Sequence, residues 1–161
     1  MSQKLISIIP ARSGSKSIKD KNIKLFKGKP LIFWSIKSSK QCKKINKTIV
    51  STDSKRYANI AYKCGADIVL IRPKKISKDS SSDLEFIKHA IRYLKFDYEY
   101  IAHLRPTTPL RNISDLNEAI SKFKKTNFSS LRTVHENSES AYKSFEMRKK
   151  QLVTIFNKKK I

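Results

Sequence analysis

The sequence predicts an α/β fold of three layers, in which helices cover both faces of a mostly parallel sheet. Short apolar or β-branched runs alternate with longer segments of helical periodicity along most of the chain. The first run, residues 5–9, is apolar almost throughout, which is typical of a strand buried on both faces. Loops that contain Arg, Ser and Pro follow several of the predicted strands. These observations together favour a sheet with a polar edge.

The predicted strands are bounded by the ends of the apolar runs. The strand Leu5–Ile9 ends before Pro10, which has no backbone N–H to donate to a sheet ladder. Residues 48–52 are mostly β-branched and predict a second strand. Further strands are expected at 67–71, 98–104 and 130–134, and the strands of a hairpin at 142–147 and 152–156.

Helices are expected between these strands. Pro30 is favourable in a first helical turn and opens the first helix. The second, through residue 62, is expected to be capped by Thr52 or Asp53. Ser82 and Glu85 have the spacing of a capping box and begin the third. A fourth begins at residues 114–115.

Length and charge restrict the class of protein. The chain has 161 residues, which predicts one domain over residues 1–161. Its 36 Lys and Arg against 13 Asp and Glu give a formal net charge of +23, which attracts polyanions. The lysines are spread almost evenly, however, and no nucleic-acid recognition motif is present, so we expect no nucleic-acid partner. A basic nucleic-acid-binding module remains the less favoured alternative. A compositional preference for lysine predicts lysine side chains that point to solvent.

The cysteines and the N-terminus indicate a cellular compartment. Cys42 and Cys64 fit no C-x-x-C pattern, and free thiols in a reducing cytosol are the simplest interpretation. Residues 1–4 precede an apolar run that is too short for a signal peptide, and no segment reaches membrane-spanning length. The sequence therefore predicts a cytoplasmic protein with no membrane partner.

A polar loop after the first strand, residues 11–22, is the strongest functional signal. Gly14 favours close backbone approach to a ligand, and Arg12, Lys16 and Lys21 supply positive charge. Fixed dipoles with nearby cations are what a polyphosphate requires, so we call residues 11–22 the anion loop. The alternative is a solvated basic turn, because the G-x-x-x-x-G-K-[ST] and G-x-G-x-x-G spacings are both missing.

Polar residues also follow the other predicted strands. They lie in Ser51-Thr52-Asp53, Arg72-Pro73 and Arg105-Pro106. Ligands of parallel α/β sheets bind at the carboxyl ends of the strands, so these residues and the anion loop are expected to form one site. For Asp53, a capping role competes with a role in holding a metal or substrate, and we favour the cap.

Four stretches together resemble the acylneuraminate cytidylyltransferases, which include the CMP-sialic, CMP-legionaminic and CMP-pseudaminic acid synthetases. They are Ile8-Ile9-Pro10-Ala11-Arg12-Ser13-Gly14-Ser15-Lys16 with Lys21-Asn22, Gly28-Lys29-Pro30-Leu31-Ile32, Ile49-Val50-Ser51-Thr52-Asp53, and Leu104-Arg105-Pro106-Thr107-Thr108-Pro109-Leu110-Arg111. The resemblance implies a Rossmann-like nucleotidyltransferase fold, incomplete at its C-terminus. The activity that it implies is transfer of CMP from CTP to a sialic-acid-like nonulosonic sugar with release of pyrophosphate.

The resemblance also implies roles for particular residues. Arg12 and Lys21 would act in catalysis by offsetting phosphate charge. Arg72 would approach the cytosine, and Arg105 and Thr107 would bind the sugar. The implied nucleotide-binding residues are Ala11, Arg12, Ser13, Gly14, Ser15, Lys16, Lys21, Asn22, Arg72, Ser80, Ser81 and Ser82.

The resemblance implies substrates and partners as well. They are CTP, an acidic nine-carbon sugar, Mg²⁺ and, in the full-length family, a second copy in a homodimer. The Asp-x-Asp pair that binds Mg²⁺ in relatives does not occur here, so we expect a C-terminally truncated chain with no metal ligands. Residues 140–161 are similar to the start of a dimerisation excursion. A catalytically incomplete CTP-binding fragment that needs a partner chain is the alternative function.

Overall fold

The computed structural model describes residues 4–15, 17–134, 145–148 and 151–154. Contacts divide the chain into two compact units, residues 1–127 and 128–161. In the second unit, β7 (Phe145–Arg148) and β8 (Gln151–Thr154) form an antiparallel two-stranded sheet, which confirms the predicted hairpin. The single domain over residues 1–161 stays a prediction.

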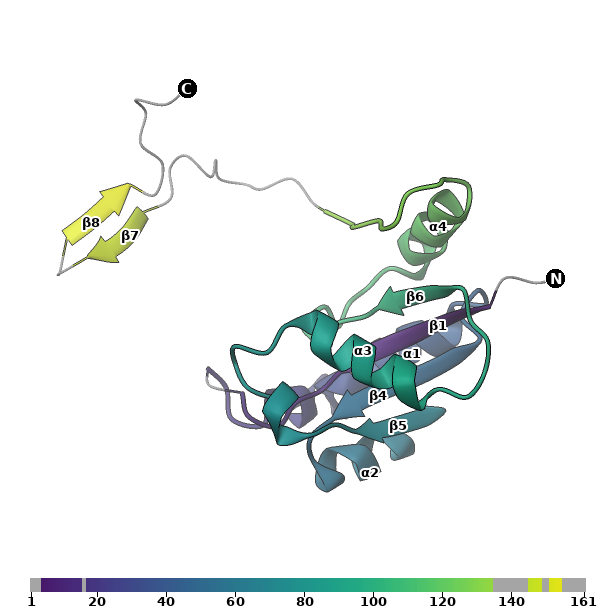
Figure 1. Cartoon of the computed structure of the whole chain (residues 1–161). Helices are drawn as coiled ribbons and strands as arrows, with labels where there is room; N and C mark the ends of the chain where they lie inside the picture. The colour runs from purple at the N-terminus through teal and green to yellow at the C-terminus, as the bar shows by residue number, and fades with distance from the viewer. Residues whose placement is uncertain (1–3, 16, 135–144, 149–150, 155–161) are drawn as a thin grey trace. The chain divides into compact units, whose positions relative to one another are not determined.

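The first unit contains a four-stranded parallel sheet. Its strands are β1 (Leu5–Pro10), β4 (Lys47–Thr52), β5 (Ile68–Ile71) and β6 (Tyr100–His103), in the order β5-β4-β1-β6 (Figure 1). All four strands therefore end at the same edge of the sheet. The predicted mostly parallel sheet is confirmed.

Helices cover both faces of this sheet, as predicted. Ile6 and Ile8 of β1 pack with Phe86 of α3 (Asp83–Tyr93) on one face. Ile9 packs with residues of α1 (Leu31–Gln41) and α2 (Lys55–Lys63) on the other. Because successive side chains of a strand point to opposite faces, one apolar run supplies both cores. The helix α4 (Ile113–Lys124) packs on Leu5 and Cys42 through Ile120.

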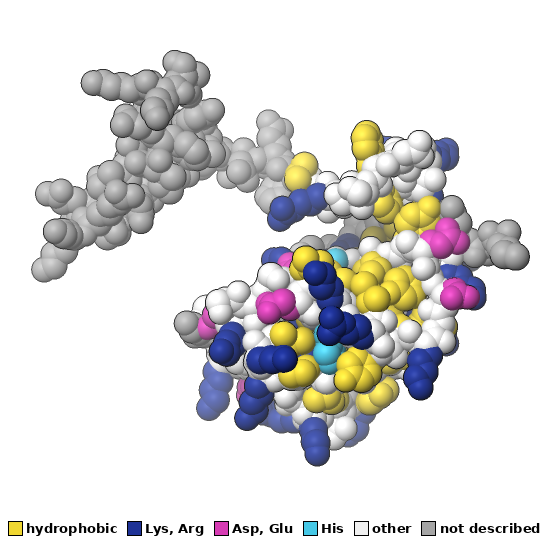
Figure 2. All heavy atoms as spheres, viewed as in Figure 1, with side chains coloured by type: hydrophobic (Ala, Val, Ile, Leu, Met, Phe, Trp, Pro, Cys, Tyr) yellow, Lys and Arg dark blue, Asp and Glu magenta, His cyan; other side chains and the backbone are white. Residues whose placement is uncertain are grey.

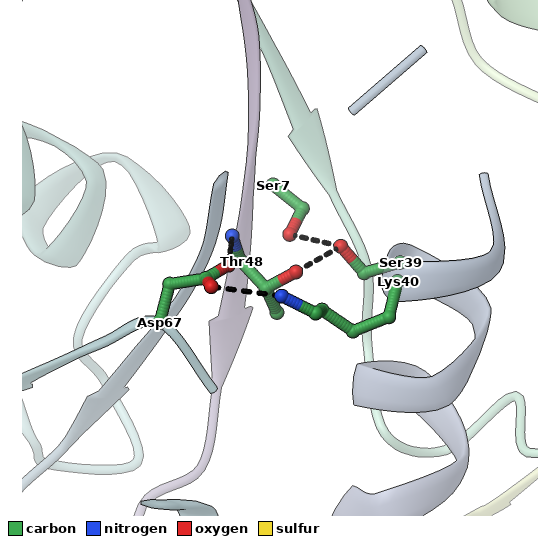
Figure 3. Close-up of polar contacts among 5 residues, drawn as sticks. All are labelled: Ser7, Ser39, Lys40, Thr48 and Asp67. Atoms are coloured by element: carbon green, nitrogen blue, oxygen red, sulfur yellow. Dashed lines mark hydrogen bonds and ion pairs between the residues drawn. The ribbon is translucent and has the colours of Figure 1, made fainter. Parts of the chain in front are cut away.

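A buried polar network joins α1 to the sheet (Figure 3). The hydroxyl of Ser39 lies 2.7 Å from those of both Ser7 and Thr48. Beside it, the carboxylate of Asp67 accepts from Lys40 Nζ at 2.8 Å and from Thr48 N–H at 2.7 Å. Each buried hydroxyl of this network thus has a partner, which limits the cost of burying it.

Four short elements were not predicted. They are η1 (Lys21–Ile23), β2 (Leu25–Phe26), β3 (Lys29–Pro30) and η2 (Lys74–Ile76). Lys27 and Gly28 join β2 to β3 with φ values of 49° and 73°, the left-handed backbone that a two-residue hairpin turn requires. The Lys-Gly pair was the only local signal of this hairpin.

Two predictions about element boundaries are wrong. Residues 130–134 form no strand; they are exposed and pair with no other described strand, and β-propensity alone does not hold an isolated strand. The cap of α2 is Ser54, whose Oγ accepts from Tyr57 N–H, and neither Thr52 nor Asp53. The capping box of Ser82 and Glu85 at the start of α3 is confirmed.

Lysine side chains in the described ranges point to solvent, as the compositional interpretation predicts. Lys21, Lys44 and Lys124 are half-buried, and the other described lysines are exposed. Figure 2 shows Lys and Arg side chains spread over the visible face of the first unit rather than gathered in one patch. Among the described helices, none has the length and apolar character needed to cross a bilayer.

Candidate functional site

A cleft of about 320 Å³ lies where the strands of the parallel sheet end. The loops after β1 and β5, purple and teal in Figure 1, both lie at the edge to which the arrowheads point. The N-terminus of α3 and the segment after β6 complete the wall. The lining residues are Pro10, Arg12, Ser15, Lys21, Asn22, Arg72, Ile76, Ser77, Lys78, Asp79, Ser81, Ser82, Asp83, Phe86, Arg105, Pro106 and Thr107.

The charge of this cleft is positive on balance. The guanidinium and ammonium groups of its wall belong to Arg12, Lys21, Arg72, Lys78 and Arg105. They outnumber the carboxylates of Asp79 and Asp83. Lys16, predicted to add a further cation, lies outside the described residues. A ligand that carries several negative charges suits this wall.

Arg12 begins the anion loop and forms an ion pair with Asp79. About a third of each side chain is exposed, so the pair lies at the mouth of the cleft and in contact with water. Asp79 belongs to the segment between β5 and α3, so the pair connects two separate segments of the wall. Before a ligand anion can occupy the guanidinium of Arg12, it must compete with this carboxylate.

The backbone of the anion loop is held by several hydrogen bonds. Asp53 accepts the Ser13 N–H on Oδ1 at 2.8 Å and the Ser13 hydroxyl on Oδ2 at 3.1 Å. Asn22, which is buried, donates from Nδ2 to the Arg12 carbonyl at 2.9 Å. The Ala11 N–H donates to the Ser51 carbonyl at 2.9 Å. The N–H groups of Ala11 and Ser13 are therefore engaged within the protein.

Gly14 does not adopt the left-handed backbone angles that glycine permits. Its φ is outside the positive region, where among the described glycines only Gly28 and Gly65 are found. A Cβ at Gly14 would meet nothing within 4 Å, and the residue is exposed outside the cleft wall. Close approach of a ligand to this backbone stays a prediction.

Arg72 is the most deeply buried cation of the wall, with 5% of its surface exposed. Its guanidinium carbon lies 5.2 Å from the centre of the Phe86 ring, and its Nε has no hydrogen-bond partner in the described protein. Burial lowers the pKa of Arg72, while the charges of Asp53 and Asp83 raise it. Arginine nevertheless stays protonated in proteins. The structure therefore holds a fixed donor against an aromatic ring.

Of the predicted serines, Ser81 and Ser82 line the cleft and Ser80 does not. The Ser82 N–H donates to Glu85 Oε2 at 2.7 Å, within the capping box. The Ser81 hydroxyl accepts from the Lys78 N–H at 3.1 Å, which holds the turn before α3. The start of α3 and the turn before it thus hold both serines in the cleft wall.

Arg105 and Thr107 also line the cleft, as their place after β6 predicts. Arg105 forms an ion pair with Asp83, the first residue of α3. His103 Nδ1 lies 3.9 Å from the same carboxylate, and burial lowers the pKa of His103. Asp83 therefore connects the third helix to the end of the edge strand β6.

Asp79, Asp83 and Phe86 are among the wall residues that sequence reasoning did not assign to the site. Asp79 and Asp83 stand next to the predicted serines, but no local pattern indicated that they would pair with Arg12 and Arg105. Phe86 lies one turn into α3, where an aromatic side chain is usually explained by the core. Only the meeting of β5 and α3 brings it against Arg72.

Nucleotide-binding α/β proteins bind their ligands in such a cleft, outside the carboxyl ends of a parallel sheet. Residues 6–158 match the protein family described as Cytidylyltransferase. The chain belongs to this family, as the resemblance of its four stretches implied.

Two curated proteins illustrate the similarity. N-acylneuraminate cytidylyltransferase of Escherichia coli O18:K1:H7 (strain RS218 / NMEC) is 44% identical over 120 residues, which cover 74% of this chain and 28% of that protein. Pseudaminic acid cytidylyltransferase of Campylobacter jejuni subsp. jejuni serotype O:2 (strain ATCC 700819 / NCTC 11168) is 32% identical over 159 residues, 97% of this chain and 68% of that protein. The chain thus spans between 28% and 68% of the length of these two relatives.

Solved structures agree with the fold. CMP:2-keto-3-deoxy-manno-octonic acid synthetase complexed with CTP has a TM-score of 0.66 at 20% identity, covering 76% of this chain and 48% of that one. A cytidylyltransferase from Leptospira borgpetersenii serovar Hardjo-bovis (strain JB197) has a TM-score of 0.59 at 21% identity, covering 78% and 50%. These similarities confirm the Rossmann-like nucleotidyltransferase fold.

Proposed function

We propose that the cleft binds CTP and that the protein transfers CMP from CTP to an acidic nonulosonic sugar. Family membership supports the reaction class, and the names of the similar curated proteins support the kind of sugar. The observation that carries the proposal is the convergence of Arg12, Lys21 and Arg72 on one cleft at the strand ends. A triphosphate and a base would occupy different parts of the same wall.

In this reaction the anomeric hydroxyl of the sugar attacks the α-phosphorus of CTP. A bond from the sugar oxygen to the α-phosphorus forms as the hydroxyl gives up its proton to water. The bond from the α-phosphorus to the oxygen that bridges to the β-phosphate breaks, and pyrophosphate leaves with the bonding electrons. Arg12 would clasp phosphate oxygens with its planar fork, and Lys21 would offset the charge that develops on the leaving pyrophosphate. Positioning and charge stabilisation suffice for such chemistry without a covalent intermediate.

Recognition of the base is assigned to Arg72. Its buried guanidinium lies on Phe86 and has an Nε–H without a described partner. Cytosine presents acceptors at O2 and N3, which such a donor would satisfy. Burial of an unsatisfied donor is costly. A base that supplies the missing acceptor therefore binds with a more favourable free energy here than at an exposed arginine.

Arg105 and Thr107 would bind the acidic sugar on the side of the cleft formed after β6. The guanidinium of Arg105 suits the carboxylate of such a sugar, and Asp83 holds that guanidinium in place in the free protein. The carboxylate of the sugar would then either displace Asp83 from Arg105 or bind the same guanidinium beside it.

The described residues do not fit a resident Mg²⁺. No group of three or more His, Cys, Asp or Glu side chains in the described ranges is arranged to hold a metal. The two carboxylates of the cleft, Asp79 and Asp83, are ion-paired to arginines. We therefore derive no step through Mg²⁺, which enters the proposal only as a companion of the CTP triphosphate. We also propose, on the basis of the family resemblance, that the protein is cytoplasmic and acts as a homodimer.

The partial length favours one alternative function. Because the chain spans 28% to 68% of the two relatives described above, we expect the cleft to bind CTP even where turnover needs a further polypeptide. In that case the protein is a CTP-binding part of a cytidylyltransferase.

Isothermal titration with CTP and UTP, with and without Mg²⁺, tests the proposal. We expect CTP to bind more tightly than UTP, because uracil presents an N3–H donor where cytosine presents an acceptor. Release of pyrophosphate in the presence of sialic, legionaminic or pseudaminic acid would establish transfer. CTP binding without pyrophosphate release would favour the alternative, and no CTP binding would refute both.

A further inference from the structure

Asp53, at the end of β4, contacts the anion loop through both oxygens of its carboxylate. Oδ1 accepts from the Ser13 N–H at 2.8 Å and Oδ2 from the Ser13 hydroxyl at 3.1 Å, across 40 positions of sequence. The residue is half-buried, and it does not cap α2, since Ser54 has that role. We infer that Asp53 is a positioning residue that orients Arg12 for a phosphate ligand, an inference that rests on the proposed function.

The peptide group between Arg12 and Ser13 shows how this works. Its N–H belongs to Ser13 and donates to Asp53, while its carbonyl belongs to Arg12 and accepts from Asn22 Nδ2 at 2.9 Å. A peptide group is planar, so hydrogen bonds at both of its ends fix its orientation. The Arg12 side chain leaves the backbone next to this fixed plane and therefore starts in one direction, toward the cleft wall that it lines.

Asp53 also acts on the second arginine of the wall. Its negative charge raises the pKa of Arg72, against the lowering that burial causes. One carboxylate thus contacts the loop that would hold phosphate and acts through its charge on the guanidinium that would read the base. Its two oxygens already accept hydrogen bonds from Ser13, which makes a role as a metal ligand the weaker interpretation.

A loop that is ordered before the ligand arrives loses less conformational freedom on binding. Without Asp53, the Arg12–Ser13 peptide would be held at its carbonyl alone, and Arg12 would have to be ordered by the phosphate itself. The expected loss of CTP affinity for Asp53→Ala is about tenfold to about a hundredfold, typical of residues that orient a binding group. Asp53→Asn keeps an acceptor for the Ser13 N–H and should recover part of the loss.

The control is Asp67, a carboxylate at the opposite end of the sheet that likewise accepts a backbone N–H, in this case that of Thr48 in β4. Asp67→Ala should lower the melting temperature and leave CTP affinity unchanged. The decisive readout is a double-mutant cycle between Asp53→Ala and Arg12→Ala by titration calorimetry. If Asp53 acts through Arg12, the two losses are less than additive. Wild-type affinity in a folded Asp53→Ala variant, or fully additive losses, would overturn the inference.

A ligand-free measurement separates this inference from the proposed function. Amide hydrogen exchange should show the Ser13 N–H protected in the wild-type protein and exposed in Asp53→Ala, with β1 protected in both. Unchanged protection at Ser13 refutes the orienting role whatever the protein binds. If the wild-type protein fails to bind CTP while Ser13 loses protection, the proposed function fails and Asp53 still orders the loop.

Discussion

Arg12 has two possible anionic partners, the carboxylate of Asp79 and the phosphate of a nucleotide. In the free protein the first is in place, and both side chains remain about one-third exposed. The affinity for a nucleotide therefore depends on how much more strongly Arg12 interacts with the phosphate than with Asp79. We therefore expect substitutions of Arg12 and of Asp79 to change the affinity for CTP in opposite directions.

Replacing Arg12 by Ala should weaken CTP binding by about 1.5–3 kcal/mol, the range of hydrogen bonds to charged groups. The loss arises because the variant has no planar fork for the phosphate oxygens. Titration calorimetry measures the change, and the melting temperature without ligand serves as the control for folding. An unchanged affinity would remove Arg12 from the site.

Replacing Asp79 by Asn should strengthen CTP binding, by up to about fivefold. The substitution keeps the size of the side chain but removes the charge that competes for Arg12, and ion pairs exposed to this degree contribute about 1 kcal/mol or less. The matched control is Asp97→Asn, which removes one carboxylate outside the cleft wall. Weaker CTP binding in Asp79→Asn would show that this carboxylate assists the nucleotide.

At the residue scale, sequence reasoning found four of the five wall cations, all but Lys78, and none of their acidic partners. Arg12, Lys21, Arg72 and Arg105 follow strand ends or lie in the loop after β1, and the sheet brings them to one cleft. The pairing of Arg12 with Asp79 depends on the paths of two loops that are far apart in the sequence, by more than half the length of the first unit. No spacing rule encodes such a contact.

At the scale of elements, the hydroxyls of Ser7, Ser39 and Thr48 determine how α1 is seated on the sheet (Figure 3). Ser39→Ala should destabilise the protein by about 1–3 kcal/mol, because it leaves two buried hydroxyls without their partner. Denaturant unfolding measures the change. Ser38→Ala is the comparison, since the Ser38 hydroxyl donates only to the Trp34 carbonyl of its own helix, at 2.9 Å. An equal loss in both variants would contradict the role of the network.

Asp67 joins α1 to the start of β4 and makes stability depend on pH. Burial raises the pKa of Asp67, but hydrogen bonds from Lys40 and the Thr48 N–H lower it more, to below its ordinary value of 3.8. Its contribution is therefore complete above that value and is lost as the pH falls through the folded-state pKa. The melting temperature of the wild type should exceed that of Asp67→Asn at neutral pH, and the difference should shrink below about pH 4. A difference that grows on acidification would contradict this assignment.

The long elements could be predicted because their signals are local. The run Leu5–Ile9 and the box of Ser82 and Glu85 each match one element of the structure. The hairpin β2–β3 has two residues a strand, too few for any periodicity, and its turn uses Lys27 at positive φ. The strand predicted at residues 130–134 does not form for a different reason. The segment has β-forming residues, Thr133 and Val134, but no described strand pairs with it.

At the scale of the whole molecule, the net charge of +23 produces a non-specific attraction to polyanions. We expect any binding of single-stranded nucleic acid to be independent of sequence and to fall steeply between about 50 mM and about 200 mM salt. CTP binding in the cleft should fall less over this range. Fluorescence anisotropy with two unrelated oligonucleotides measures the first effect. Binding that prefers one sequence and survives at the higher salt would favour a nucleic-acid-binding module.

The central strand of the sheet is also the first to be synthesised. β1 pairs with β4 and β6, and its residue Ile8 lies opposite Ile49 and His103. At about 5–20 residues per second, a ribosome needs several seconds to go from the first of these segments to the last. During that time the apolar run Leu5–Ile9 emerges before the strands that pair with it, so we expect its isoleucines to stay exposed in the nascent chain until β4 and β6 follow.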